Sequence, residues 1–178
     1  MKPVSLLWTT SIAQLATTDP LTGLANRRFA MQALDQLWHK AGQHAEELSC
    51  MLIDADHFKE INDSYGHDAG DIVLCELSQQ LKYALRTDDI VCRLGGDEFL
   101  ILCPRTNKEG LLHIAEQMHA KIAELTIPVP GGAWRGSISV GIAVKTSAMK
   151  EPEELIKAAD NGVYAAKKAG KNCVKLGI

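Results

Sequence analysis

Two adjacent carboxylates at a glycine-rich turn are the part of this sequence best suited to chemistry. Residues 93–99 read Arg-Leu-Gly-Gly-Asp-Glu-Phe, and the residues on both sides, 90–92 and 100–102, are apolar and typical of β-strands. Two glycines between such runs predict a tight β-hairpin with Asp97 and Glu98 at its tip. Because like charges repel at this spacing, the pair indicates either a cation site or a solvated Asp-Glu turn.

A third carboxylate stands at the end of a predicted buried strand over residues 48–54. If that strand lies beside the hairpin, Asp54 comes close to Asp97 and Glu98. Carboxylate oxygens are the ligands that hard cations prefer, and Mg²⁺ in particular keeps coordination positions open for substrate phosphates. The three acids therefore predict a Mg²⁺ site, which Mn²⁺ could also occupy, at one end of a sheet.

Cationic residues and a helix start could supply the phosphate contacts that such a metal site needs. Phe58 and Lys59 open a short predicted helix, whose first backbone N–H groups can hold an anion. Lys167, Lys168 and Lys171 gather at the end of the last predicted helix. There they could clamp a triphosphate, or they could be solvated charges that the helix dipole favours.

Asn62 and Asp71 are suited to the recognition of a purine base. An amide together with a carboxylate can pair with the exocyclic amine and the ring N–H of guanine, whereas a carboxylate has nothing to offer the acceptor edge of adenine. The alternative is that both are ordinary polar residues near helix ends.

The elements that must position these residues follow from hydrophobic periodicity and from breakers. Besides the acidic hairpin and a structured turn over 18–24, we expect helices over 26–44, 58–64, 70–85, 111–125 and 152–169, strands over 48–54, 136–145 and 173–176, and a loop over 128–132. This order predicts an α+β fold with a mixed, mainly antiparallel sheet and helices packed on its faces. Gly162 lies inside the last expected helix, where glycine costs about 1 kcal/mol relative to alanine.

Composition limits the class of protein. At 178 residues, with 46% apolar and 23% charged residues, the chain is expected to be one soluble globular domain. A formal charge of −3 argues against a nucleic-acid partner. The five cysteines form no CxxC pair, which favours buried free thiols in a reducing compartment over disulfides or a zinc site.

The sequence has no run long enough to span a membrane and no evident signal peptide, which predicts a cytoplasmic protein. Apolar residues recur every three or four positions between Val4 and Leu15. We therefore expect residues 1–17 to be the end of a connecting or dimerising helix and residues 18–178 to be the domain itself. We also expect the chain to be a piece of a larger sensor protein.

Many of these residues belong to motifs that resemble those of one family. The motifs are Asp19-x-Leu21-Thr22-Gly23-Leu24-x-Asn26-Arg27-Arg28, Asp54-x-Asp56-x-Phe58-Lys59-x-x-Asn62-Asp63-x-x-Gly66-His67-x-x-Gly70-Asp71, Arg93-x-Gly95-Gly96-Asp97-Glu98-Phe99, Ser139-x-Gly141-x-Ala143 and Ala159-Asp160-x-x-x-Tyr164-x-Ala166-Lys167-x-x-Gly170-x-Asn172. In this order they closely resemble the signature of GGDEF domains, the diguanylate cyclases of bacteria. The resemblance covers nearly the whole chain from Asp19 onward.

The resemblance implies a palm-like fold related to adenylyl cyclases and polymerases. It also implies the condensation of two GTP molecules into cyclic di-GMP with release of two pyrophosphates. Two subunits of a homodimer would each bind one GTP and face each other. Product inhibition by cyclic di-GMP would occur at an Arg-x-x-Asp motif, which Arg86 and Asp89 match, with help from Arg93.

The resemblance also implies roles for single residues. Asp54, the backbone carbonyl of Ala55, Asp97 and Glu98 would hold the metals. Asp97 and Glu98 would be the catalytic acids, and Asp97 would help to deprotonate the 3′-hydroxyl. GTP would be bound by Phe58, Lys59, Asn62, Asp71, Gly95, Gly96, Lys167 and Lys171, of which Asn62 and Asp71 would contact guanine. Lys171 stands where the family more often has arginine, and it keeps the positive charge.

Two other functions are alternatives. A GGDEF module can be catalytically silent and act as a receptor for GTP or cyclic di-GMP. Such modules usually lose an acid or a glycine from the hairpin, whereas Gly95, Gly96, Asp97 and Glu98 are all present here. A transferase that makes a mixed purine cyclic dinucleotide is disfavoured by Asp71. The sequence therefore predicts an active, GTP-specific, product-inhibited diguanylate cyclase.

Overall fold

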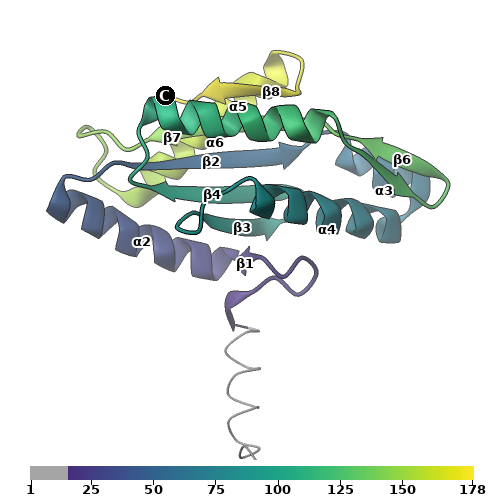
Figure 1. The fold of residues 1–178 in the computed structure, drawn as a ribbon, viewed down its shortest axis with the longest axis horizontal. Coiled ribbons are helices and arrows are strands. Elements are labelled where there is room, and N and C mark those ends of the chain that lie inside the picture. Colours follow the sequence, from purple (N-terminus) through teal and green to yellow (C-terminus); the bar gives the residue numbers. More distant parts are fainter. Residues whose placement is uncertain (1–15) are drawn as a thin grey trace, which may run out of the picture.

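The computed structural model describes residues 16–178, so the helix expected over residues 1–17 lies almost wholly outside the described residues. One six-stranded sheet, in the order β1-β3-β4-β2-β7-β8, forms the centre of the fold, and a separate two-stranded sheet pairs β5 with β6 (Figure 1). The strands are β1 (Ala25–Asn26), β2 (Leu48–Ala55), β3 (Ile90–Gly95), β4 (Glu98–Pro104), β5 (Thr126–Val129), β6 (Gly132–Arg135), β7 (Ile138–Val144) and β8 (Cys173–Leu176). The helices are α2 (Arg27–His44), α3 (Phe58–Tyr65), α4 (His67–Tyr83), α5 (Lys108–Ala123) and α6 (Pro152–Lys168). In this described part of the chain, no helix is both long and apolar enough to cross a membrane.

The strand β2 lies at the centre of the sheet and pairs antiparallel with β4 on one side and with β7 on the other. The outer pairs, β1 with β3 and β7 with β8, are parallel. The expected α+β fold with a mixed, mainly antiparallel sheet is thus confirmed. The register places Asp54, near the end of β2, directly opposite Glu98 on β4 and Ser139 on β7.

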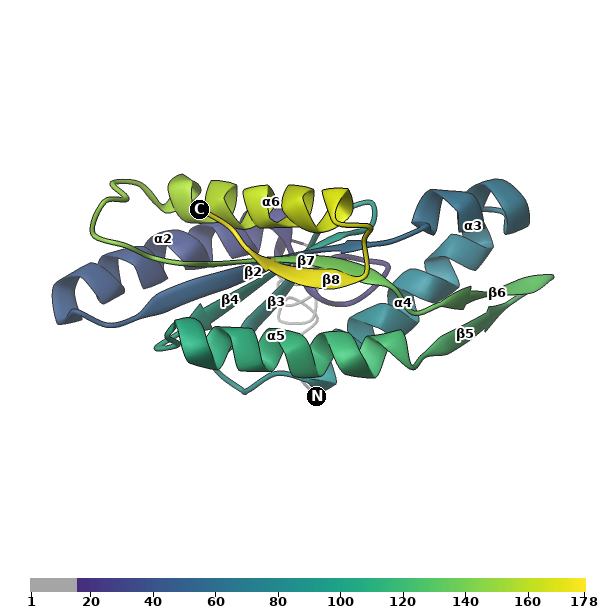
Figure 2. The same ribbon diagram turned by 90° about the horizontal axis from the view of Figure 1, so that it is seen from above.

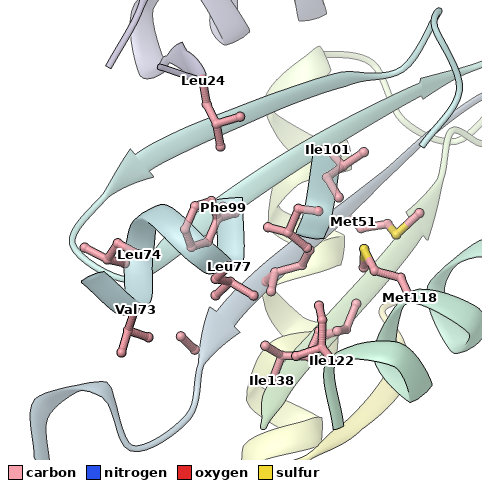
Figure 3. Packing of buried hydrophobic residues seen from close by; sticks show 14 of the residues in the cluster. Leu24, Met51, Val73, Leu74, Leu77, Phe99, Ile101, Met118, Ile122 and Ile138 are labelled. Atoms are coloured by element: carbon pink, nitrogen blue, oxygen red, sulfur yellow. The ribbon is translucent and has the colours of Figure 1, made fainter. Parts of the chain in front are cut away.

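Alternate residues of β2 contribute to two separate cores, because successive side chains of a strand point to opposite faces. Met51 and Ile53 join the core under α4 and α5, whereas Cys50 and Leu52 join the core under α2 and α6. Figure 2 shows these two helix layers on opposite sides of the sheet, and Figure 3 shows the packing within the first core. By the same alternation, Asp54 belongs to the face that α2 and α6 cover.

Local signals in the sequence set where the helices begin. Asn26 caps α2 by accepting a hydrogen bond from the backbone N–H of Phe29 at 2.9 Å. Glu151 takes part in a capping box at the start of α6. The helix α4 begins at His67, earlier than the sequence predicts, because Gly66 adopts a φ of 89° that ends α3 and lets the next helix start at once.

The expected loop over residues 128–132 is too wide, because only Pro130 and Gly131 form a turn and the residues on either side of them are in strands. Residues 126–135 form the β5–β6 hairpin. Pro128 is exposed on this two-stranded ribbon, where its missing N–H is tolerated, while Ile127 and Trp134 are buried in the core under α4 and α5. The prolines and glycines correctly indicate the turn. They also interrupt the alternation of buried and exposed residues by which β5 and β6 could have been recognised as strands.

Two glycines let α6 lie directly against β7. A Cβ added to Gly162 of α6 would lie 2.7 Å from Cα of Gly141 in β7 and 2.7 Å from the carbonyl oxygen of Lys175 in β8. The residue that weakens the helix locally is therefore the residue that the close approach of helix and sheet requires.

All five cysteines are free, and Cys50, Cys92 and Cys103 are buried in the sheet. Burial raises the pKa of the Cys50 thiol and of the Cys92 thiol to about 12, so both stay protonated near neutral pH. These thiols belong to the core, as the sequence predicts.

Candidate functional site

The β3–β4 hairpin and the end of β2 lie side by side. The backbone N–H of Ala55 donates to the carbonyl oxygen of Asp97 at 3.2 Å, which carries the contact between the strands up to the turn. The turn uses Gly95 and Gly96, whose φ angles of 140° and 52° favour glycine. Arg93 braces the turn, because its Nε and Nη2 donate to the carbonyl oxygen of Gly96 at 3.0 and 2.9 Å. The predicted hairpin is thus present, and its tip lies beside the end of β2.

The last turn of α6 brings a cation to the same corner of the sheet. Nζ of Lys167 lies 2.8 Å from Oδ2 of Asp54, whose side chain is only 13% exposed. Partial burial by itself lowers the pKa of the Lys167 ammonium, but the hydrogen bond to Asp54 and the nearby charges of Asp97 and Glu98 outweigh burial and raise that pKa. A fully charged ammonium from the far end of the sequence therefore lies against the acids.

Asp97 is a partly buried acid, and the positive charge near it does not compensate for its burial and for the neighbouring acids. Burial raises the pKa of its carboxyl group, the negative charge of Asp54 raises it further, and Lys167 offsets these effects only in part. A divalent cation near the two carboxylates would reverse this balance. The electrostatics of this corner therefore favour a further cation, because Lys167 supplies only part of the positive charge.

The carboxylates alone do not enclose an ion. Within residues 16–178, no three side chains of the types His, Cys, Asp and Glu lie close enough together to hold a metal. Asp54 and Glu98 are direct neighbours across the strand ladder, and Asp97 adjoins them through its backbone. This open set of oxygen donors fits Mg²⁺, which is usually held by one or two carboxylates together with substrate phosphates and water.

Asn62 of α3 and Gly70 of α4 form a small cradle between the two helices. Oδ1 of Asn62 is buried and has no hydrogen-bond partner among the described residues. A Cβ at Gly70 would overlap this oxygen and would lie 3.1 Å from Cζ of Phe58. Because a buried acceptor without a donor costs free energy, Asn62 is suited to accept a hydrogen bond from a ligand. Lys59 and Asp71, which adjoin this cradle in the sequence, are exposed.

Lys168, the last residue of α6, and Lys171, in the turn that follows, have different surroundings. The pKa of Glu60 on α3 is lowered by its hydrogen bond with His57 and also by the charge of Lys171, so Lys171 lies on the side of α3. Nζ of Lys168 lies 4.6 Å from the ring centroid of Tyr164 and makes a cation–π contact with it. Of the two, Lys171 is the one whose charge acts on α3.

Sequence reasoning gave no role to Asp56. Its carboxylate accepts hydrogen bonds from the hydroxyls of Ser137 and Ser139, each at 2.7 Å, and from the backbone N–H of Asn172 at 3.0 Å. Its position two residues after Asp54 was visible in the sequence. Its partners were not, because they lie 81 to 116 residues further along the chain.

Arg86 and Asp89 come together in the connection between α4 and β3. The side chain of Asp89 has no exposed surface, and it accepts from the backbone N–H of Arg86 at 3.0 Å and from the Arg86 guanidinium at 3.4 Å. That guanidinium also donates to the hydroxyl of Thr106. Both residues line a cavity of about 410 Å³, to which Lys82 and Thr87 also contribute.

Arg93 supports the hairpin and does not line that cavity. Its Nη1 lies 3.2 Å from Oδ2 of Asp19, which ties the hairpin to the turn before β1. Partial burial by itself raises the pKa of Asp19, but hydrogen bonds from Thr22 and the charge of Arg93 outweigh burial and lower that pKa. A contact between Arg93 and a bound product stays a prediction.

The fold and this corner define an α+β domain with an acidic hairpin beside a central strand, and comparison with known proteins identifies the family. The family model described as "Diguanylate cyclase, GGDEF domain" matches residues 16–173. The GGDEF domain of DgcB from Caulobacter crescentus, solved in complex with c-di-GMP, matches with a TM-score of 0.86 at 27% identity over 90% of this chain and 93% of that chain. The GGDEF domain of TpbB (YfiN) from Pseudomonas aeruginosa matches with a TM-score of 0.84 at 36% identity over 90% of this chain and 94% of that chain. The chain belongs to the GGDEF domain family.

Two curated relatives show how the chain compares with full-length proteins. The response regulator PleD of Caulobacter vibrioides is 42% identical over 163 residues, which are 90% of this chain and 36% of that protein. The probable diguanylate cyclase DgcC of Escherichia coli is 37% identical over 159 residues, which are 89% of this chain and 42% of that protein. The chain therefore spans less than half of the length of these relatives.

Proposed function

We propose that this chain is a diguanylate cyclase, which condenses two GTP molecules into cyclic di-GMP and releases two pyrophosphates. In each of two steps, a 3′-hydroxyl oxygen forms a bond to the α-phosphorus of the other GTP, the bond from that phosphorus to the β-phosphate breaks, and the hydroxyl proton passes to a base. The observation that carries the proposal is the corner where Asp54, the β3–β4 hairpin and Lys167 meet. Relatives at 37% and 40% identity that are named probable diguanylate cyclase DgcC and diguanylate cyclase DgcM support it.

The acids of this corner would hold Mg²⁺ or Mn²⁺. We assign this role to Asp54, Asp97, Glu98 and the backbone carbonyl of Ala55, because they supply only the oxygen atoms that these ions prefer. When bound, the metal lowers the pKa of the attacking hydroxyl and neutralises charge on the leaving pyrophosphate. Asp97, at the tip of the hairpin, would accept the proton of the 3′-hydroxyl with Glu98 beside it.

The lysines and the nearby backbone would bind the triphosphate. Lys167 would exchange its present partner Asp54 for a phosphate oxygen, and this exchange would free Asp54 for the metal. Lys171 and Lys59 would add charge from either side. The backbone N–H groups of Gly95, Gly96 and the α3 start at Phe58 would donate to phosphate oxygens, since helix starts and tight turns favour anions.

Guanine would bind beside α3 and α4. The buried Oδ1 of Asn62, which lacks a partner among the described residues, would accept from the exocyclic amine. The carboxylate of Asp71 would accept from the amine and the ring N–H. This donor pattern is absent from adenine, so we expect GTP to be the substrate and ATP to be rejected.

The reaction would need two subunits, because each GTP supplies the hydroxyl that attacks the other. We propose a homodimer in which the helix expected over residues 1–17 helps to bring the domains together. The product would bind back at Arg86 and Asp89, with Arg93 in support, since a guanidinium can pair both with O6 and N7 of guanine and with phosphate.

Product analysis tests this proposal. The chain is freed of co-purified nucleotide, fused at its N-terminus to a strong dimerising coiled coil, and incubated with GTP, Mg²⁺ and competing ATP. Chromatography with mass identification should find cyclic di-GMP as the sole cyclic product. A mixed dinucleotide would contradict the role of Asp71. Absence of any product from a verified dimer would refute the cyclase and leave the silent receptor.

Matched variants test the residues. Asp54→Asn and Asp97→Ala should each lower turnover by about 100-fold or more, because each removes charge from the metal corner, and should leave the far-UV circular dichroism unchanged. Asp35→Asn, which alters an exposed acid on α2, should keep full activity. Normal turnover by Asp54→Asn or Asp97→Ala would refute the assignment of the metal site.

A further inference from the structure

Asp56 is a buried carboxylate, 2% exposed, and no cationic side chain of the described residues lies within ion-pair distance of it. Three hydrogen-bond donors take the place of a cation, namely the hydroxyls of Ser137 and Ser139 and the backbone N–H of Asn172. The backbone of Asp56 is also fixed, because its carbonyl oxygen accepts from Nε1 of Trp134 at 2.9 Å. A buried charge persists only where donors satisfy it, so Asp56 acts as a tie between distant segments.

One of these segments is the turn between α6 and β8. Gly170, Lys171 and Asn172 have φ angles of 107°, 67° and 48°. Two of the three are not glycine, and such a conformation persists only where the surroundings hold it. The backbone N–H of Asn172 is held by Asp56, and the side chain of Asn172 lies 2.9 Å from Nε2 of His119 on α5. Two hydrogen bonds of Asn172, one to Asp56 and one to His119, thus hold this turn in place.

The same turn carries charges of the proposed triphosphate site. Lys171 directly precedes Asn172, and Lys167 lies in the last turn of α6, which ends at this turn. Asp54, two residues before Asp56, holds Lys167 at 2.8 Å. The end of β2 and the residue after it therefore hold this region at two points, Lys167 in α6 and Asn172 in the following turn. A substrate phosphate would compete for the first contact, a salt bridge, but not for the second, a hydrogen bond from the backbone N–H of Asn172 to the buried side chain of Asp56.

We infer that Asp56 is a positioning residue for substrate binding, which fixes the Gly170–Asn172 turn so that Lys171 and the end of α6 meet the triphosphate. This inference rests on the proposed function and adds to it a residue that itself contacts no substrate. Pre-organisation is the physical reason, because a side chain that is already ordered loses less entropy on binding. Without the tie, Lys171 must be ordered when GTP binds, which weakens binding more than it slows the reaction of bound GTP.

Affinity and kinetics of Asp56 variants test this inference. The dissociation constant of a non-hydrolysable GTP analogue with Mg²⁺ is measured by calorimetry, and KM and kcat are measured on the coiled-coil dimer. Asp56→Ala should raise both the dissociation constant and KM by about 10- to 100-fold and change kcat much less. Asp56→Asn keeps an acceptor for the N–H of Asn172 and should recover most of the affinity. Ser49→Ala is the control, because it removes a buried hydroxyl at the other end of β2 that donates to the carbonyl oxygen of Cys103, and it should leave KM unchanged.

A double-mutant cycle with Lys171→Ala separates positioning from general loss of structure. If Asp56 acts through Lys171, Asp56→Ala should add little to the affinity loss in the Lys171→Ala background. Additive effects, or an unchanged affinity in Asp56→Ala, would overturn the inference. The proposed function would still stand in that case, provided that the wild-type chain makes cyclic di-GMP. A wild-type chain that neither binds the analogue nor makes product would refute both. Should Asp56→Ala not fold, Ser137→Ala replaces it, because it removes the hydroxyl that shares Oδ2 of Asp56 with Asn172, and a severalfold rise in the dissociation constant is then expected.

Discussion

Replacement of Gly162 by alanine tests whether helix propensity or tertiary packing decides the stability of α6. Propensity alone predicts that Gly162→Ala stabilises the protein by about 1 kcal/mol. The structure predicts the opposite sign, because the new Cβ would lie 2.7 Å from Cα of Gly141 and 2.7 Å from the carbonyl oxygen of Lys175. Both obstacles are backbone atoms, which cannot rotate away as the end of a side chain can.

The net effect of this substitution follows from two opposing terms. Overpacking typically costs about 1–3 kcal/mol, and obstacles made of backbone place this site near the upper end. After the helix gain of about 1 kcal/mol is subtracted, a loss of about 2 kcal/mol remains. For a chain of this length, each kcal/mol lowers Tm by about 2–4 °C, so we expect Tm to fall by about 4–8 °C. The shift of α6 away from β7 would also move Lys167 relative to Asp54, and turnover should fall with stability.

Denaturant unfolding followed by far-UV circular dichroism measures this effect, and Gly42→Ala provides the matched control. Gly42 lies in α2, where an added Cβ would have no described heavy atom within 4 Å. Only the propensity term then operates, so Gly42→Ala should raise the free energy of unfolding by about 0.5–1 kcal/mol. If Gly162→Ala stabilised the protein to the same degree as Gly42→Ala, the argument from close packing would be refuted.

Four further predictions concern the proposed catalytic and product-binding residues. Because the pKa of Asp97 is raised in the folded protein, the folded state binds that proton more tightly than the unfolded state, and the free energy of unfolding should fall as the pH rises above about 3.8. Asp97→Asn should remove this dependence in unfolding curves between about pH 4 and 7, and an identical slope in the variant would contradict the cause given for the shift. Mg²⁺ at ten times its Kd should stabilise the wild type by about 1.4 kcal/mol and Asp97→Asn by less, which thermal melts would detect. Arg86→Ala should raise the half-inhibitory concentration of cyclic di-GMP by about tenfold or more, whereas an unchanged inhibition curve would mean that Arg86 and Asp89 form only a structural pair. Asp71→Ala should lower kcat/KM for GTP by at least about tenfold and weaken discrimination against ATP, and full retention of GTP preference would exclude Asp71 from base recognition.

The acidic hairpin was predictable because its signals are local. Two glycines between apolar runs define a turn and two strands, and Asn26 likewise marks the start of α2 by its own side chain. Features that depend on neighbours within a few residues need no knowledge of the rest of the fold. The position of Asp54 at the end of a buried strand could be predicted for the same reason.

Other features could not be predicted because distant residues determine them. The strands on either side of the turn at residues 130–131 could not be predicted, since Pro128 obscured the strand pattern and only the core under α4 and α5 explains why Trp134 is buried. Gly162 weakens α6 when the helix is considered alone, and only the close approach of β7 explains why glycine stands there. In each case the deciding atom belongs to a segment that is remote in sequence.

The sequence by itself determined most of the helices and strands, the motif order and the types of residue available to the site, because each of these depends on short-range propensity and spacing. Only the tertiary structure decided which of these residues meet. The strand order puts Asp54 opposite Glu98, the packing of α6 on β7 brings Lys167 to Asp54 across 113 residues, and the buried carboxylate of Asp56 fastens the turn that follows α6. The physical reason is that such contacts depend on the relative placement of whole elements, which burial and close packing set together rather than residue by residue.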